Sequence, residues 1–140
     1  MKRLIAQGAE AKLFLEGNSI LKQRIKKSYR IKQIDEKLRG FRTRREGKIL
    51  QKLETINFNA PGFIRSDEKE NLIIEKIEGK LVKEVFNHDL NKDYKKLCHE
   101  IGKMLAILHN NDIIHGDLTT SNMIINVDKS KDKNKRNIYF

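Results

Sequence analysis

A polar segment of eight residues, His115–Asn122, does most to limit what this chain can fold into. Before it, apolar residues recur at helical spacing, and Ile113–Ile114 forms a short apolar run. The helical positions are Tyr94, Leu97, Ile101, Leu105 and Leu108. After it comes a second apolar run, Met123–Ile125. This order predicts a helix, a strand, a polar loop and another strand.

Asp117 and Asn122 lie five residues apart within the polar segment. Phosphoryl transfer needs a carboxylate to orient and deprotonate the attacking hydroxyl, and ligands for the metal ions that hold the phosphates. One loop with this spacing can supply one of each. The segment follows the H-R-D-x-x-x-x-N pattern of kinase catalytic loops, with Gly116 in place of Arg. A polar turn between two short strands stays open as the alternative, because short motifs also occur by chance.

The chain has 140 residues, which is enough for one core, or for a small lobe joined to part of a second. No apolar run approaches the roughly 20 residues of a membrane span, so no membrane contact is expected. Cys98 is the only cysteine, which excludes an internal disulfide and fits a reducing cytoplasm. Its place on the apolar face of the 94–108 helix predicts a buried small side chain rather than a catalytic thiol.

Positive charge is concentrated in one segment. Residues 22–48 hold twelve Lys and Arg against three acids, a local balance of +9 in a chain of net charge +11. A concentrated basic surface attracts polyanions, nucleic acid above all. The candidate contacts are Lys26, Lys27, Arg42 and Arg44. A solvated face of a Lys-rich protein is the alternative, because no aromatic stacking platform is interleaved with the charges.

The rest of the chain predicts a strand-rich first half and a helical second half. Strands are expected at Leu4–Ile5, Lys12–Leu15, Ile20–Ile25, Leu72–Ile77 and from Asn137, helices at Gln33–Leu53 and Leu81–Phe86, and a charged hairpin loop at Asp128–Arg136. Gly40 predicts a bend or break in the long helix. The order predicts an α+β, protein-kinase-like fold: a β-rich N-lobe with one long helix (1–77) and a truncated, mainly helical C-lobe (78–140). The nucleotide would lie between the lobes.

Two charged residues in the first half fit this expectation. Kinases use a lysine on the third strand to hold the α- and β-phosphates and a glutamate on the next helix to fix it. Lys22 is central in the third expected strand, and Glu46 lies in the helix that follows. Either residue alone is more often a surface charge, but their order with Asp117 and Asn122 favours the kinase interpretation.

The segment Gln7-Gly8-Ala9-Glu10-Ala11 occupies the place of a phosphate-covering loop, with one glycine rather than three. Small residues allow backbone N–H groups to approach phosphates. Glu10 is unusual there, because a carboxylate beside phosphates is repulsive unless it binds a metal, a base or another loop. A tight hairpin is the alternative for this segment.

Together these stretches resemble one family, the small atypical kinase of the KEOPS complex (the Bud-type or p53-related protein kinase family). The stretches that carry the resemblance are Gln7–Ala11, Lys22–Arg30, Arg42–Glu46, Glu75–Gly79 and Ile114–Asn122. The Thr119-Thr120-Ser121 insert and the Glu10 loop separate the chain from RIO kinases and antibiotic phosphotransferases, which are expected to share only the His-Gly-Asp frame.

The resemblance implies an ATP- and Mg-dependent Ser/Thr kinase or ATPase that supports threonylcarbamoyl adenosine modification of tRNA. Implied partners are the threonylcarbamoyl-transferring subunit, a small regulatory subunit on the N-lobe, and tRNA through the complex. By position, Asp117 would be the catalytic carboxylate, Asn122 a Mg ligand, Lys22 the phosphate lysine and Glu46 its partner. The ATP-binding residues would be Lys22, the loop Gln7, Gly8, Ala9, Glu10 and Ala11, with Ile5 before it, and Glu75 and Ile77 at the hinge.

The family's metal-binding Asp-Phe-Gly would follow Asn137–Phe140 almost at once. We therefore expect the 140-residue chain to be inactive or weak in phosphoryl transfer. The alternative function is a non-enzymatic scaffold or RNA-binding module that retains kinase motifs.

Overall fold

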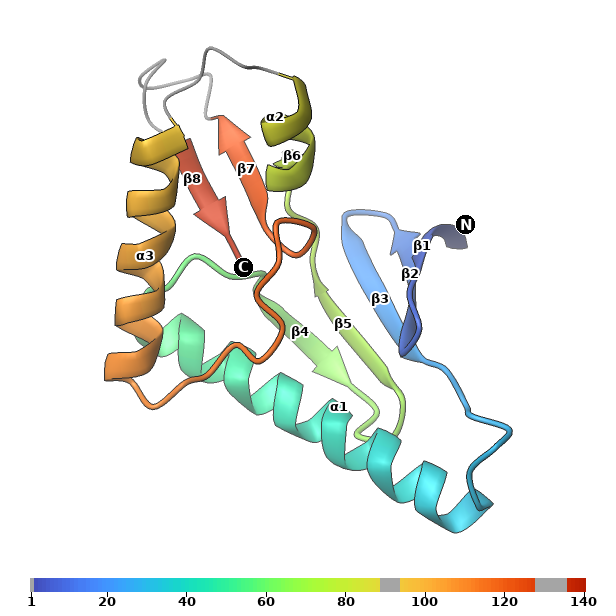
Figure 1. Ribbon diagram of the computed structural model, residues 1–140. Helices are drawn as coiled ribbons and strands as arrows, with labels where there is room; N and C mark the ends of the chain where they lie inside the picture. The colour runs from blue at the N-terminus through green and yellow to red at the C-terminus, as the bar shows by residue number, and fades with distance from the viewer. Residues whose placement is uncertain (1, 89–93, 128–135) are drawn as a thin grey trace. The chain divides into compact units, whose positions relative to one another are not determined.

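The computed structural model describes residues 2–88, 94–127 and 136–140 (Figure 1). Its contacts divide the chain into two compact units, Met1–Lys76 and Ile77–Phe140, and each unit has its own sheet. Within the described ranges, no helix has both the length and the apolar character needed to cross a bilayer.

The first unit contains a five-stranded antiparallel sheet in the order β1-β2-β3-β5-β4. Its strands are β1 Lys2–Gln7, β2 Ala11–Glu16, β3 Ser19–Arg24, β4 Phe63–Ser66 and β5 Asn71–Glu75. Gly17 forms the β2–β3 turn with φ +60°, a left-handed conformation that glycine adopts without steric cost. In β3, Lys22 lies opposite Leu13 of β2 and Leu72 of β5. β3 is therefore an interior strand with fixed register on both sides.

Helix α1, Lys32–Thr55, packs against β4 and β5 as one uninterrupted helix of 24 residues. The predicted bend or break at Gly40 is wrong. Gly40 is buried, and a Cβ there would lie 3.2 Å from the Glu68 carbonyl oxygen. The glycine therefore permits a close approach to the β4–β5 turn. Gly47, about two turns further along α1, also permits a close approach, because a Cβ there would lie 3.1 Å from the Phe63 ring.

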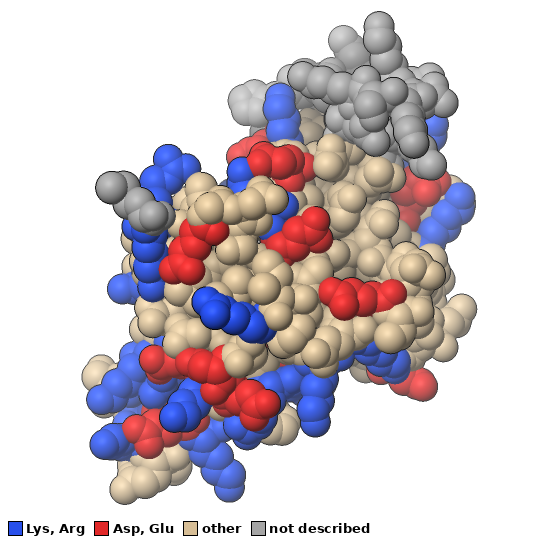
Figure 2. Space-filling model, turned by 180° about the vertical axis from the view of Figure 1, so that it is seen from behind, with Lys and Arg blue, Asp and Glu red and all other residues tan. Residues whose placement is uncertain are grey.

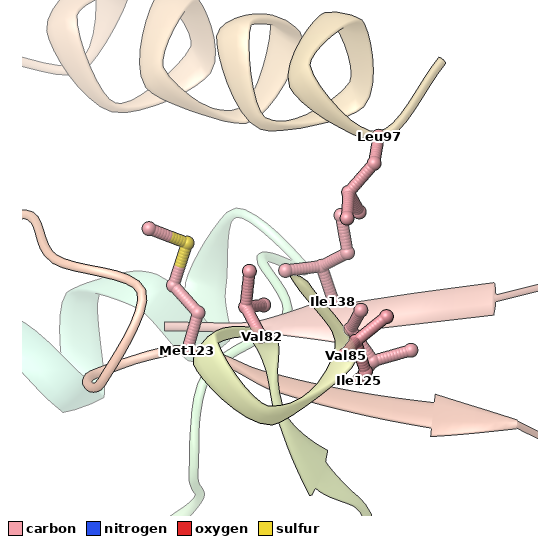
Figure 3. Packing of buried hydrophobic residues seen from close by; sticks show 6 residues of the cluster. All are labelled: Val82, Val85, Leu97, Met123, Ile125 and Ile138. Atoms are coloured by element: carbon pink, nitrogen blue, oxygen red, sulfur yellow. The ribbon is translucent and has the colours of Figure 1, made fainter. Parts of the chain in front are cut away.

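The second unit contains a three-stranded antiparallel sheet and two helices. The strands are β6 Lys80–Leu81, β7 Ile124–Val127 and β8 Arg136–Tyr139, and the helices are α2 Val82–His88 and α3 Tyr94–Asn110. Figure 3 shows the apolar cluster that joins them. It consists of Val82, Val85, Leu97, Met123, Ile125 and Ile138. Val82 has no exposed surface, so the start of α2 is the best-buried point of this cluster.

Three local predictions for the second unit have different outcomes. Cys98 is exposed, so its predicted burial is wrong: the buried stripe of α3 runs through Leu97 and Leu108, and Cys98 is turned about 100° from Leu97 around the helix. Ile113–Ile114 forms no strand; Ile113 is buried and Ile114 is 78% exposed. The predicted hairpin loop at Asp128–Arg136 lies almost wholly outside the described residues.

Candidate functional site

Lys22 and Glu46 form an ion pair between β3 and α1. The Lys22 Nζ lies 2.7 Å from Glu46 Oε1. The other carboxylate oxygen, Oε2, accepts a hydrogen bond of 2.6 Å from Arg24 Nη2. The structure therefore brings together the two residues that the sequence predicted to pair, and it adds a second cation that the sequence interpretation did not include.

Packing next to the pair sets its position. Gly47 lets α1 approach the sheet, where the Leu72 side chain lies 3.9 Å from the place of a Gly47 Cβ. Leu72 is 2% exposed and pairs with Lys22 across β3 and β5. One buried leucine thus backs both the strand that carries Lys22 and the helix turn that carries Glu46.

The loop between β1 and β2 is a hydrogen-bonded turn tied to the rest of the first unit. Gly8 N–H donates to the Ala11 carbonyl at 2.9 Å, and Ile25 N–H donates to the Glu10 carbonyl at 3.0 Å. The Glu10 carboxylate accepts from Arg42 Nη1 at 2.7 Å and lies 3.8 Å from Lys27 Nζ. Lys27 Nζ also donates to the Ala9 carbonyl. Glu10 therefore binds two bases, one of which comes from α1.

Of the residues expected to surround an adenine, two lie in strands and the third lies between β5 and β6. Ile5 is in β1 and is 46% exposed. Glu75 ends β5, where its N–H donates to the Gly62 carbonyl at 2.9 Å and its carboxylate accepts from Gly62 N–H at 3.2 Å. Ile77 begins the second unit and is half-buried. Adenine binding by these residues stays a prediction.

In the second unit, Asp117 and Asn122 are joined directly. Asn122 Nδ2 donates to the Asp117 backbone carbonyl at 2.9 Å and to its carboxylate Oδ2 at 3.0 Å. Asp117 N–H in turn donates to His115 Nδ1 at 3.3 Å. Gly116 has φ +78°, a left-handed conformation that accounts for glycine where kinase loops usually have Arg.

The amide of Asn122 is oriented by these bonds. Because its nitrogen donates to Asp117, its Oδ1 is the side-chain atom left to bind a cation, and Mg²⁺ takes oxygen ligands. Asp117 adds a carboxylate beside it. Among residues 2–88, 94–127 and 136–140, no three His, Cys, Asp or Glu side chains gather as a metal site. The donor set fits an ion held by one or two protein oxygens together with phosphate and water.

Many Lys and Arg side chains of the basic segment 22–48 bind protein acceptors. Figure 2 shows Lys and Arg gathered with Asp and Glu among them at the lower left, over the start of α1. Arg44 Nη1 donates to the Glu68 carbonyl at 3.0 Å, and Arg42 and Lys27 bind Glu10. Lys26 differs, since it borders a hollow of about 390 Å³. This basic hollow is lined by Lys12, Gln23, Arg24, Ile25, Lys26, Arg39 and Glu70.

Asp35 is a buried acid that the sequence interpretation did not single out. It lies in the first turn of α1, where a negative charge favours the helix N-terminus, and it has no exposed surface. Burial raises the pKa of its carboxyl, but hydrogen bonds from Arg39 and the Lys27 amide, with the charges of Arg39 and Arg30, outweigh burial and lower it. The acid anchors the β3–α1 connection.

Comparison with known proteins identifies relatives of this chain. The chain is 43% identical over 134 residues to the KEOPS complex subunit Bud32 of Pyrococcus abyssi, covering 88% of this chain and 61% of that protein. It is 41% identical over 127 residues to a bifunctional tRNA threonylcarbamoyladenosine biosynthesis protein of Methanobrevibacter smithii, covering 87% of this chain and 22% of that one. The chain thus spans about three fifths of the first relative.

A solved structure of WbdD with the kinase inhibitor LY294002 has the same fold, with a TM-score of 0.62 at 17% identity, over 87% of this chain and 29% of that one. This confirms the α+β, kinase-like fold class. The RIO domain family model matches residues 12–131. The likeness to RIO domains therefore extends well beyond the expected His-Gly-Asp frame. The resemblance to the Bud-type KEOPS family is confirmed by its relatives, and the chain belongs to the RIO domain family.

Proposed function

We propose that this chain carries the nucleotide-binding and catalytic loops of a KEOPS-type atypical kinase or ATPase. The observation that carries the proposal is the Lys22–Glu46 ion pair of 2.7 Å, in a chain 43% identical to a KEOPS Bud32 subunit. A strand lysine paired to a helix glutamate is the arrangement that kinases use to hold ATP phosphates. The hydrogen-bonded Asp117 and Asn122 supply the groups for transfer.

Each residue then has a chemical task. Lys22 binds the α- and β-phosphates, and Glu46 keeps its ammonium in place. Backbone N–H groups of the 7–11 loop approach the phosphates, while Ile5, Glu75 and Ile77 contact adenine. Asp117 accepts the proton of the attacking hydroxyl, which is a Ser or Thr hydroxyl or water.

Asn122 Oδ1 would hold Mg²⁺. The ion, when bound, neutralises charge on the phosphates. Asp117 is held for its task by Asn122, because the amide hydrogen bond fixes Oδ2 and leaves Oδ1 to accept the proton.

The complex around the chain is also included in the proposal. The protein would act in the cytoplasm with a threonylcarbamoyl-transferring subunit on tRNA. A small regulatory subunit would bind the first unit. Exposed apolar side chains just before α1 and along its first half support such a contact. They are Ile31, Ile34 and Phe41, which are 66%, 51% and 54% exposed.

Phosphates of tRNA would bind at the basic hollow. Among the described residues, none forms a hydrogen bond or ion pair with the side-chain ammonium of Lys12 or Lys26, so both groups are available to an anion. Lys27, Arg42 and Arg44 are proposed as weaker contacts, because protein acceptors already bind them.

The test is ATP hydrolysis and autophosphorylation by the full-length protein that carries this chain. Asp117→Asn removes the base with little change in volume, and Lys22→Ala removes the phosphate ligand. Each should lower turnover by about a hundredfold or more. Asp112→Asn, the same chemical change at an exposed residue outside the loop, is the control.

Undiminished turnover in both variants would overturn the kinase assignment and favour a non-enzymatic scaffold. Near-normal nucleotide affinity in Asp117→Asn would not, because binding and the chemical step are separable.

A further inference from the structure

Glu46 holds two cations, and a phosphate lysine accounts for only one. Lys22 occupies Oε1 and Arg24 occupies Oε2, at 2.7 and 2.6 Å. Of the two cations, Arg24 is the more buried, with its side chain 12% exposed against 30% for Lys22. The carboxylate is thus fixed from both oxygens.

Arg24 is itself held by one turn of α1. Its Nη2 also reaches the Arg42 carbonyl at 3.3 Å, and its Nε donates to Thr43 Oγ1 at 3.2 Å. Thr43 is 1% exposed, and its hydroxyl contacts the Arg39 carbonyl at 2.9 Å. The planar guanidinium therefore binds helix positions 42, 43 and 46 from two separate nitrogens, whereas a lysine ammonium donates from a single point.

The backbone of Arg24 is fixed on the other side. Its N–H donates to the Glu70 carbonyl at 2.9 Å, just past the end of the β3–β5 pairing. Lys22 lies two residues earlier on the same strand. Side chains at that spacing lie on the same face of the strand, so Arg24 and Lys22 approach α1 together.

The terminal torsion of a glutamate is soft, because rotation about an sp³–sp² bond has a broad minimum. With Lys22 alone, the Glu46 carboxylate could turn, and the ammonium would follow it. A second bond to the other oxygen removes that freedom. The orientation of the Glu46 carboxylate is then fixed by Arg24 and α1, and does not depend on Lys22.

We propose that Arg24 is a positioning residue that acts through Glu46 to orient Lys22 for phosphate binding. The expected effect on ATP turnover rests on the proposed function, whereas the expected effect on the order of the Lys22 side chain does not. In this role Arg24 contacts neither ATP nor metal, although its side chain also lines the basic hollow. Its loss should affect the chemical step more than ATP affinity, since misplacing a phosphate contact costs rate.

The first arm of the test needs no activity. In the full-length protein, ¹⁵N relaxation of the Lys22 ammonium reports its order. Arg24→Gln should lower that order markedly. Arg45→Gln, which removes a positive charge from the exposed α1 position next to Glu46, should not. Unchanged Lys22 order in a folded Arg24→Gln protein would overturn the proposal.

The second arm is a double-mutant cycle on ATP turnover. Arg24→Gln should lower kcat by about tenfold to a hundredfold with KM for ATP within about threefold. In a Lys22→Ala background the same substitution should change kcat by less than about twofold, because the residue it acts through is gone. An equal loss in both backgrounds would show that Arg24 acts independently, and would refute the inference.

Arg24→Lys separates charge from geometry. It keeps the positive charge and should unfold within a few degrees of wild type, yet it lacks the two separate nitrogens that bind Thr43 and Glu46, so it should not restore kcat. Full recovery of kcat by lysine would overturn the positioning role. If the wild-type protein shows no ATP turnover, the proposed function fails, and the relaxation arm still decides whether Arg24 orders Lys22.

Discussion

Leu72→Ala should destabilise the first unit by about 3 kcal/mol. Leu72 is 2% exposed between β3 and the Gly47 turn of α1. Truncation removes three carbons, worth about 2.4 kcal/mol at about 0.8 kcal/mol per buried methylene. The remaining cavity adds to this, and Leu→Ala changes in other cores cost about 2.7–5.0 kcal/mol. Because the cavity adjoins β3 and α1, the Lys22–Glu46 pair should loosen as well.

The matched control is Leu4→Ala, the same change at a β1 residue that is 49% exposed. It should cost less than about 1 kcal/mol. Urea unfolding followed by circular dichroism gives the free energies, and hydrogen exchange of the β5 amides assigns the loss to the first unit rather than the second. A loss below about 1 kcal/mol, or one equal to that of Leu4→Ala, would refute the packing argument.

Two further predictions concern charge. The pKa of Asp35 is lowered below its ordinary 3.8, so the unfolded chain binds the proton more readily; the stability this carboxylate contributes is present above that value and is lost as pH falls through the folded pKa. Urea midpoints between pH 2 and 7 should therefore fall less steeply with acid in Asp35→Asn than in wild type, and parallel curves would contradict this. Replacing Lys12 and Lys26 with Gln in the full-length protein should weaken tRNA binding and lower the salt slope by about 1.4–1.8, while Lys95→Gln on α3 should not; an unchanged slope would mean that the basic hollow binds no RNA phosphate.

The fold was largely predictable because turn residues separate its elements and apolar residues open or recur in most of them. The apolar pair that opens Ile20–Ile25 just after a Gly-Asn turn, and the apolar spacing from Ile34 to Leu53, are local signals, and both elements form. Strand β4 was missed because its four residues, Phe63–Ser66, offer too short a pattern. The reason for Gly40 could not be found locally either, since it depends on the Glu68 carbonyl 28 residues away.

The part of the candidate site that chain order and motif spacing define could be predicted from the sequence. Lys22, Glu46, Asp117 and Asn122 each stand at the place that a kinase pattern requires, and the structure joins them in two pairs, one in each unit. Their catalytic roles stay predictions. Arg24 and Asp35 were missed because their importance comes from hydrogen bonds between elements, which no sequence spacing expresses. A second base two residues after a strand lysine is the one signal that could have drawn attention to Arg24.

The sequence alone also does not show which basic residues are available to bind a polyanion. Counting residues 22–48 gives +9, but the acceptors that bind its bases include Glu10, Glu70 and the Glu68 carbonyl, which all lie outside the segment. Folding thus compensates much of a charge that looks free in the sequence. A polyanion can bind only those cationic side chains that have no described partner in the folded chain. Lys12, which lies outside the counted segment, has such a side chain. A basic segment therefore marks where to look for an RNA contact, while the partners of each base decide which residues can make it.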